Sequence, residues 1–432
     1  MVASVSALTS SGQAASYYES TGEYYADGGQ SPSEWQGKGA EALGLSGDVD
    51  RDQFRDLLDG KVADQQLGTT RDGKLEHRPG WDVTLSAPKS VSIMAEVAGD
   101  RRLIAAHSAA VKTALVHVEQ HMSATRVRDG GAVNREATGN LVIASFQHGT
   151  SRAQDPQLHT HNVVLNATKG EDGTWRSLEP RAIYQLQKQI GAIYRQELAL
   201  KVRELGYEIE TGKGSMFEIK GVSGDVLAAF STRSAEIEAA LGTRGTTRDE
   251  ASAAEKQVAA LDTRQAKVAA DPAALVADWR ETATAAGFGA EARLAMVKEA
   301  EAVAISPDHR ANMELQGDSA ACRAVAHAAD KLGERQSVFS VAALHEEAGR
   351  VGLGKVSYAQ ISDAIAAAAK QGQLIDRTHI DRRGAEFAGF TTRFNVETET
   401  KMLRIEAEGR GTLSPIASPL AAAKAVASAS AQ

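Results

Sequence analysis

Three histidines lie close together in the middle of the chain, with a spacing that suits metal binding. His148 ends the segment LVIASFQH, and His159 and His161 form a His-x-His pair in QLHTHNVV. Residues two apart in a β-strand point to the same face, and both segments alternate as strands do. A polar loop at 149–157 joins them. Pairing of the two strands would bring three neutral imidazoles to one point, which makes a divalent-metal site with open, catalytic positions.

The donor set narrows the choice of ion without fixing it. Imidazole favours Zn²⁺, Mn²⁺, Ni²⁺ or Cu²⁺ over Mg²⁺. Mg²⁺ would bind this set weakly unless phosphate oxygens completed its shell. We expect one divalent ion, with Mg²⁺ or Mn²⁺ in use and Zn²⁺, Ni²⁺ or another imidazole-favoured ion as alternatives. A single histidine would more often be an ordinary core or surface residue. Three histidines that converge are more often metal ligands.

Tyrosines cluster near the N-terminus. Four of the eight tyrosines lie within nine residues, as the pairs Tyr17–Tyr18 and Tyr24–Tyr25. A phenol is a poor nucleophile at its ordinary pKa of about 10, but it becomes effective when a metal or a base stabilises the phenolate. Together with the histidines, the cluster predicts phosphodiester transesterification, in which tyrosine attacks phosphorus, a 5′-phosphotyrosine forms and a 3′-hydroxyl leaves. Aromatic packing is the alternative role for the pairs.

These motifs resemble those of the MobF-type conjugative relaxases of the HUH superfamily, the N-terminal part of plasmid-transfer relaxase-helicases. The matching segments are ASYYES, YYADGG, SEWQGKGAEALGL, GWDVTLSAPKSVS and HGTSRAQDPQLHTHNVVLN. The resemblance is dense from Ala14 to Asn166 and weaker to about residue 290. It implies strand-specific nicking and later religation of a plasmid transfer origin. Because such proteins continue into a helicase and no nucleotide-binding motif follows here, we interpret the sequence as a fragment.

The resemblance also assigns roles around the predicted metal. Tyr17 is the leading nucleophile and Tyr24 a second one, since cutting and rejoining need two transesterifications. Neighbouring residues on a helix point about 100° apart, so Tyr18 and Tyr25 are less favoured. Asp82 in GWDVTL is expected to accept a ligand histidine N–H or to assist deprotonation of the phenol. A solvated strand aspartate is the alternative.

Basic residues indicate where DNA would bind. Asp72 and Gly73, between the polar arms of 61–79, predict a β-hairpin, and such a two-stranded ribbon can enter a major groove. Single-stranded DNA would occupy a cleft near the metal, with Trp35 and Trp81 as candidate stacking platforms. Solubilising surface charge is the alternative role of the basic residues. The predicted DNA contacts are Arg71, Lys74 and Arg78 on the ribbon, and Lys89 and Arg152 near the metal.

Composition sets limits on these functions. The chain has 432 residues, 42% hydrophobic and 24% charged, which is ordinary for a soluble protein of two to three domains. A net charge of −8 argues against a purely electrostatic DNA binder, although a basic groove can lie on an acidic protein. The single cysteine, Cys322, excludes an internal disulfide and fits a reducing compartment. The first ten residues alternate like a strand and do not have the pattern of a signal peptide.

The fold is predicted to be α+β. Strand and helix patterns alternate over residues 1–220, which predicts an antiparallel-sheet palm flanked by helices and carrying the histidine site. Within it, Glu179–Leu205 is expected to be one long helix. The rest of the chain is divided into helical fingers at 221–305, a linker at 306–318, a small winged-helix-like domain at 319–410 and a low-complexity tail at 411–432.

One glycine-rich segment has a spacing that suggests nucleotide binding. Residues 349–355 have the spacing of a phosphate-binding loop, but Val356 follows where Ser or Thr would hold Mg²⁺. We interpret the segment as a turn between helices and expect no ATP hydrolysis.

Three rival functions remain open at this level. A rolling-circle replication initiator shares the chemistry. A metal-dependent oxygenase also uses His-x-His, but it would leave the tyrosines unused, and a noncatalytic DNA-binding module would need only structural histidines. For the favoured function, the resemblance implies a monomer in the cytoplasm of a bacterial donor, which travels to the recipient with the DNA. Its expected partners are transfer-origin DNA (hairpin or duplex, and single strand), relaxosome accessory proteins and the coupling protein of type IV secretion, with no membrane contact.

Overall fold

The computed structural model describes residues 3–20, 32–263, 271–380, 386–412 and 418–429. For residues 16–20 only the backbone is described. The second tyrosine pair, Tyr24 and Tyr25, lies outside the described residues.

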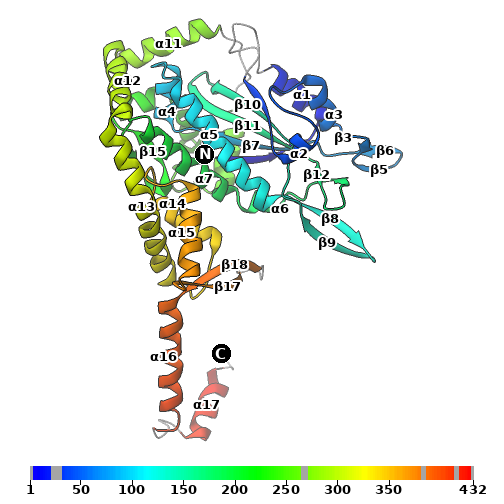
Figure 1. Ribbon diagram of the computed structural model, residues 1–432, viewed down its shortest axis with the longest axis vertical. Helices are drawn as coiled ribbons and strands as arrows, with labels where there is room; N and C mark the ends of the chain where they lie inside the picture. The colour runs from blue at the N-terminus through cyan, green and yellow to red at the C-terminus, as the bar shows by residue number, and fades with distance from the viewer. Residues whose placement is uncertain (1–2, 21–31, 264–270, 381–385, 413–417, 430–432) are drawn as a thin grey trace.

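A five-stranded antiparallel sheet forms the centre of the N-terminal part, as expected for an α+β palm (Figure 1). The strands predicted at the N-terminus and around the histidines are all present in it. In spatial order the strands are β1 (Ala3–Ala7), β7 (Gly80–Ser86), β11 (Pro156–Leu165), β10 (Ile143–Thr150) and β2 (Ser33–Gln36).

Helices cover both faces of the sheet. On one face, α4 (Lys89–Glu96), α5 (Arg102–Met122) and α7 (Gln187–Glu204) enclose the larger core. The opposite face carries a smaller core with α1 (Ser11–Ser20), α2 (Lys38–Ala42) and α3 (Arg51–Leu58). Because strand side chains alternate, the central strands β10 and β11 contribute to both cores.

The predicted helix at Glu179–Leu205 is divided in two. A short α6 (Arg181–Gln185) precedes α7, and Leu186 lies between them. Leu186 packs against the larger core at this break. It is the C-cap of α6 and the N-cap of α7.

Small hairpins surround the sheet, and two of them project from the body (Figure 1). The predicted hairpin around Asp72 is confirmed, because Asp72 and Gly73 have φ of 51° and 74°, the backbone that a tight hairpin turn requires. The hairpins are β3 (Lys61–Val62) with β4 (Gln65–Gln66), β5 (Thr69–Arg71) with β6 (Lys74–Glu76), β8 (Ala124–Asp129) with β9 (Ala132–Ala137), β12 (Thr168–Lys169) with β13 (Trp175–Arg176), and β14 (Ile209–Thr211) with β15 (Phe217–Ile219).

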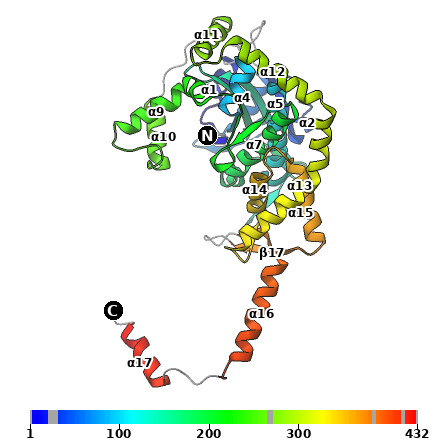
Figure 2. The same cartoon turned by 90° about the vertical axis from the view of Figure 1, so that its left-hand side faces the viewer.

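The region expected to form helical fingers is mostly helical. Its helices run along the outside of the palm, and α9 and α10 project from it (Figure 2). They are α8 (Gly224–Ala229), α9 (Thr232–Gly242), α10 (Ala253–Asp262), α11 (Pro272–Ala285) and α12 (Ala290–Ile305).

A second unit with its own core follows. It begins with α13 (Pro307–Gly333), so the segment expected to be a linker is helical instead. Pro307 lies at the first position of this helix, where its fixed φ and missing N–H are tolerated. The other elements are β16 (Phe339–Ser340), α14 (Val341–Val351), α15 (Tyr358–Lys370), β17 (Leu374–Ile380) and β18 (Glu386–Thr392), with sheet order β16-β18-β17. The glycine-rich 349–355 segment ends α14 and turns into α15, as expected.

The C-terminal helices extend away from the body (Figure 2). Helix α16 (Arg393–Gly409) has no buried residue, and α17 (Pro419–Ala429) lies in the segment expected to be a low-complexity tail. Among the described residues, no helix combines the length and the apolar character needed to cross a bilayer.

Candidate metal centre

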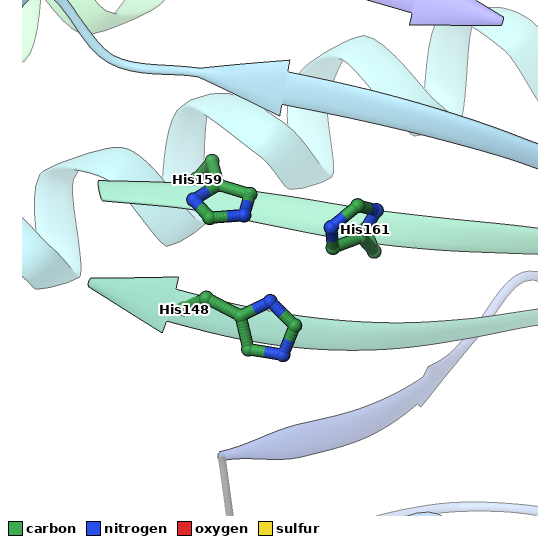
Figure 3. A group of neighbouring side chains, drawn as sticks. All are labelled: His148, His159 and His161. Atoms are coloured by element: carbon green, nitrogen blue, oxygen red, sulfur yellow. The ribbon is translucent and has the colours of Figure 1, made fainter. Parts of the chain in front are cut away.

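The three predicted histidines meet where β10 and β11 pair (Figure 3). His148 lies directly opposite His159, and His161 is paired with Phe146 on one side and Thr84 on the other. The ring centroids are 5.1–5.2 Å apart in all three pairs. One nitrogen from each ring lies within 4.8 Å of the others. The period of two along each strand therefore produces the convergence that the sequence predicts.

Hydrogen bonds fix the orientation of two of these rings. His161 Nδ1 lies 2.7 Å from Asp82 Oδ2, and His159 Nδ1 lies 2.7 Å from the carbonyl oxygen of Gln157. Since both acceptors engage Nδ1, Nε2 is the nitrogen that would ligate a metal in each ring. A group of three imidazoles, two of them oriented in this way, fits a borderline divalent ion with open coordination positions.

Asp82 occupies the position expected of a group that holds a ligand histidine. It is buried on β7, and its second oxygen accepts a hydrogen bond of 3.0 Å from Thr84 Oγ1. Thr84 Oγ1 also lies 3.1 Å from His161 Nδ1. Thr84 and Gln157 are not among the site residues predicted from the sequence. Thr84 is detectable in principle, because it follows Asp82 by two residues and must share its face.

Helix α1 places the first tyrosine pair on the same side of the sheet as the histidines. Tyr17 and Tyr18 belong to this helix. Two residues of α1, Ala14 and Ala15, are buried in the smaller core, which includes Phe146 from the same strand as His148. The backbone of Tyr17 and Tyr18 thus lies on the same face of the sheet as the histidines.

The predicted stacking platforms are wrong. Trp35 is only 5% exposed and packs edge-on against Phe54, and Trp81 is 2% exposed in the larger core. Neither indole can present a face to a DNA base, because both fill the space between sheet and helices.

Two of the predicted basic residues lie close to the start of β11. Lys89 is half-buried at the beginning of α4 and donates to the carbonyl oxygen of Pro156 at 3.0 Å. Burial lowers the pKa of Lys89, and the nearby Asp155 opposes this shift. Arg152 is half-buried in the loop between β10 and β11.

That loop also contacts the helical region. Thr232 Oγ1 donates to Asp155 Oδ1 at 2.9 Å, and Trp279 Nε1 donates to the carbonyl oxygen of Gln154 at 2.7 Å. Burial raises the pKa of Asp155, while the charge of Lys89 acts in the opposite direction. Helices α9 and α11 are therefore attached directly to the connection between the two histidine strands.

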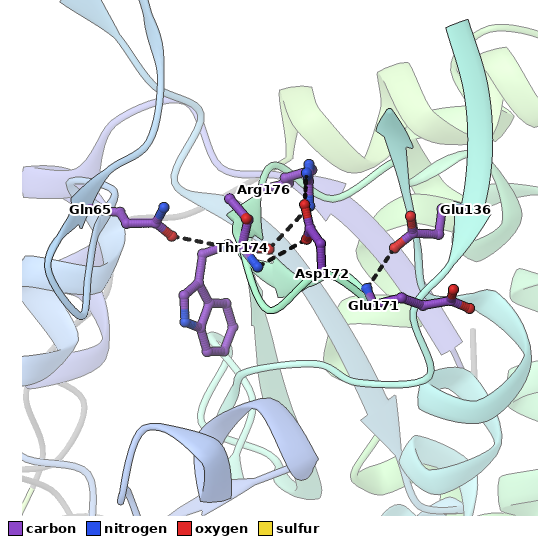
Figure 4. A network of polar contacts seen from close by, with 7 residues as sticks. Gln65, Glu136, Glu171, Asp172, Thr174 and Arg176 are labelled. Atoms are coloured by element: carbon purple, nitrogen blue, oxygen red, sulfur yellow. Dashed lines mark hydrogen bonds and ion pairs between the residues drawn. The ribbon is translucent and has the colours of Figure 1, made fainter. Parts of the chain in front are cut away.

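The other predicted DNA contacts, Arg71, Lys74 and Arg78, are exposed on and beside the β5–β6 ribbon. The β12–β13 hairpin contacts the β3–β4 hairpin and the projecting β8–β9 ribbon (Figure 4). Trp175 N on β13 donates to Gln65 Oε1 on β4 at 2.8 Å, and Glu171 N in the β12–β13 turn donates to Glu136 Oε1 on β9 at 3.0 Å. The turn is itself held by an ion pair of 2.5 Å between Arg176 and Asp172, whose pKa is lowered by the hydrogen bond from Arg176.

Comparison with known proteins identifies the family. The family model of the TrwC relaxase matches residues 11–286. The chain belongs to the TrwC relaxase family. As a relaxase of this family, it has its histidines, Asp82 and first tyrosine pair all within the matched region, and α13 and everything after it lie outside.

Individual relatives agree with this family assignment. The relaxase is 43% identical to the multifunctional conjugation protein TraI of Escherichia coli K12 over 296 residues, which are 66% of this chain and 16% of TraI. A second TraI from Escherichia coli is 41% identical over 355 residues, 78% of this chain and 19% of TraI. The chain therefore spans less than a fifth of these curated relatives.

Solved structures of TrwC are similar as well. A copper-bound TrwC in complex with oriT DNA superposes with a TM-score of 0.62 at 43% identity, covering 66% of this chain and 98% of that one. TrwC with a 27-mer DNA comprising the recognition hairpin and the cleavage site gives a TM-score of 0.61 at 41% identity, with coverage of 66% and 98%.

Proposed function

We propose that this relaxase nicks one strand of a plasmid transfer origin and later rejoins it by tyrosine transesterification. The observation that carries the proposal is the convergence of His148, His159 and His161 on the face that α1 covers. The similar TrwC structures contain oriT DNA, and some of them a metal, which supports the same substrate class here.

The histidines would hold one divalent ion, with Mg²⁺ or Mn²⁺ as the ions in use. When bound, the ion supplies charge that polarises the scissile phosphate. Asp82 accepts from Nδ1–H of His161 and so leaves the lone pair of Nε2 for the metal. The Gln157 carbonyl does the same for His159. The rings are thereby oriented before substrate arrives.

Tyr17 is the nucleophile for the first cut. Its phenolic oxygen forms a bond to phosphorus as the bond from phosphorus to the 3′-oxygen breaks, the phenol proton passes to a base, and the 3′-oxygen takes up a proton. The 5′ end stays on the protein as a phosphotyrosine. Because one ester replaces another, rejoining needs no ATP. Tyr24 is the second nucleophile, with Tyr18 and Tyr25 less favoured.

DNA recognition combines two surfaces. Arg71, Lys74 and Arg78 on the β5–β6 ribbon contact duplex or hairpin DNA. Lys89 and Arg152 contact phosphates of the single strand near the metal. The helical region at 221–305 closes over this strand, supported by the contacts of α9 and α11 with the β10–β11 loop.

The C-terminal unit is a winged-helix domain that contributes to DNA binding. The order helix, strand, two helices and a two-stranded wing supports this assignment over residues 319–410. In a bacterial donor the protein would act in the cytoplasm as a monomer, together with relaxosome accessory proteins and the coupling protein of type IV secretion, and travel to the recipient with the DNA.

A covalent-adduct assay tests the central step. The protein is incubated with a labelled single-stranded oligonucleotide carrying the nick site and Mn²⁺, then analysed by denaturing gel and peptide mass spectrometry. We expect a DNA adduct on the Tyr17 peptide that is lost in Tyr17→Phe and with a chelator, and that persists in the matched variant Tyr18→Phe. Cleavage without any adduct would mean hydrolysis by water and would refute the tyrosine mechanism. Preference for a replication origin over a transfer origin would favour a rolling-circle initiator.

A further inference from the structure

A buried chain of polar groups lies behind the His-x-His segment, on the sheet face opposite the three histidines. Thr160 stands between His159 and His161, so its side chain points to the other face of β11. Thr160 Oγ1 lies 2.8 Å from Nε2 of His107 on α5. His107 Nδ1 lies 2.6 Å from the hydroxyl of Tyr194 on α7. The chain therefore joins β11, α5 and α7.

These groups are shielded from water and matched to one another. His107 and Tyr194 are fully buried and Thr160 is 5% exposed. Burial lowers the pKa of His107 to about 3, so the ring is neutral and has one donor and one acceptor nitrogen. Each nitrogen has one hydroxyl partner. Because a buried polar group that loses its partner destabilises the fold, these hydrogen bonds hold Thr160 against α5 at one position.

The local sheet needs such an anchor. The pairing of β10 with β11 shifts register between His148 and Thr150, immediately beside the metal centre. An irregularity of this kind interrupts the regular ladder of backbone hydrogen bonds. Thr160 pairs with Gln147, next to the last regular pair of His148 with His159, so its hydroxyl attaches β11 to a helix one residue from this interruption.

We propose that Thr160, His107 and Tyr194 are positioning residues that set the spacing of His159 and His161 for metal binding. This inference rests on the proposed role of the three histidines as ligands. These three residues are not ligands themselves. They act on the positions of His159 and His161 through the backbone of β11.

Metal titration with Co²⁺ tests the inference, because its absorption spectrum reports ligand geometry independently of DNA cleavage. Thr160→Val removes only the hydroxyl and is expected to weaken Co²⁺ binding about 10-fold or more, in the range found for groups that orient ligands, and to change the visible spectrum. Thr160→Ser keeps the hydroxyl and is expected to retain both wild-type affinity and spectrum. Tyr194→Phe, which removes the far end of the chain, is expected to give a smaller change in the same direction.

Thr125→Val is the matched control. Thr125 is 1% exposed and donates to the carbonyl oxygen of Ser177, outside the metal centre, so its loss should lower thermal stability and leave Co²⁺ affinity unchanged. Wild-type affinity and spectrum in both Thr160→Val and Tyr194→Phe would overturn the inference. If wild-type protein and His159→Ala bind Co²⁺ equally, the ligand assignment itself fails, which is a separate result.

Discussion

A carboxylate near three imidazoles can either ligate a metal or orient a ligand. Asp82 is buried, and its two oxygens are used by His161 and Thr84. The metal-dependent oxygenases considered as a rival usually add a carboxylate to their histidine ligands, whereas the group of ligand atoms found in the described residues is formed by histidines alone. This arrangement favours orientation of His161 over direct coordination.

Substitution of Asp82 should therefore affect metal affinity through His161. We expect Asp82→Ala to weaken Mn²⁺ or Co²⁺ binding about 10- to 100-fold, whereas Asp82→Asn keeps an acceptor oxygen and should lose less. Calorimetric titration measures both.

The control is a second buried carboxylate, Asp100, which is bonded to Arg102 and Tyr207. Asp100→Asn should lower the melting temperature with metal affinity unchanged. An Asp82→Ala protein with wild-type affinity would show that His161 needs no orienting partner.

At the residue scale, the sequence predicts contacts between strand neighbours better than contacts between distant segments. His148, His159 and His161 follow from the period of two. His107 could not be predicted, because its partners lie 53 and 87 positions away along the chain. The two tryptophans were assigned to a surface because an indole serves equally well in a core, and only the packing of sheet and helices distinguishes these environments.

At the element scale, the seam between the relaxase core and the C-terminal unit is lined by aromatic and imidazole rings. Tyr358, the first residue of α15, has its hydroxyl 2.8 Å from His117 Nδ1 on α5, and its backbone N–H donates to Glu197 on α7 at 2.5 Å. His345 on α14 stacks on Tyr358 with ring centroids 4.8 Å apart. Burial lowers the pKa of His117 to about 3 and that of His345 to about 4.

The seam should therefore weaken in mild acid. Folded protein holds both imidazoles neutral, whereas the unfolded chain takes up protons below about pH 6.5. Their contribution to stability is complete above that pH and is lost as the pH falls toward 4, with a limiting slope of about 1.4 kcal/mol per pH unit for each group. Calorimetric melting between pH 7.5 and pH 4.5 measures the loss.

Variants at the seam separate this effect from general acid unfolding. His117→Gln combined with His345→Gln should flatten the dependence of melting temperature on pH. His327→Gln changes an exposed histidine of α13 and should leave the dependence as in wild type. Identical slopes in all three proteins would exclude the seam as the origin of acid sensitivity.

The β5–β6 ribbon supports a second prediction at this scale. If Lys74 and Arg78 contact phosphates, Lys74→Ala and Arg78→Ala should weaken binding to all transfer-origin duplexes alike, and each should reduce the slope of log affinity against log salt by about one. Fluorescence anisotropy over a salt series gives both quantities. Lys401→Ala, on the exposed α16, is the control. A slope unchanged by the ribbon variants would assign the ribbon charges to solubility.

Whole elements are predicted well where a hydrophobic pattern of one period continues over many residues. They are predicted poorly where a domain boundary rests on a single residue. The helix predicted over Glu179–Leu205 has buried residues along its length, and most of it is found as α7. The linker predicted at 306–318 depends on Pro307 as a helix breaker, yet proline is equally suited to the first turn of a helix. What decides between the two is the core that α13 forms with α14 and α15, and this core involves residues far along the chain.

At the scale of the whole molecule, the metal centre and the C-terminal unit depend on the same two helices. Helix α5 contacts β11 through His107, which is bonded in turn to Tyr194 of α7. The same two helices contact α15 through His117 and Glu197. The solved TrwC chain matches 66% of this chain over 98% of its own length.

Removal of residues 307–432 should therefore leave metal binding and nicking within about two-fold of the full chain, because the polar chain behind β11 is intact. The melting temperature should fall by about 2–4 °C for each kcal/mol by which the seam stabilises the folded protein. Calorimetry, metal titration and a nicking assay on both proteins provide the comparison. Loss of metal binding on truncation would make the unit part of the catalytic fold.

Helix α13 crosses from one part of the molecule to the other without a break. Its first turn is attached to the core, where His309 Nε2 lies 2.9 Å from the carbonyl oxygen of Arg203, and its last turns enter the core of the C-terminal unit. The length of a helix fixes both the distance and the relative rotation of the elements at its two ends. Each added residue turns everything downstream by about 100° and advances it by about 1.5 Å. A one-residue insertion at the exposed Ala311 or Asn312 would consequently rotate Tyr358 out of reach of His117, whereas a surface loop would absorb it. The number of residues in α13 is therefore constrained as strictly as the identity of the residues in the metal centre.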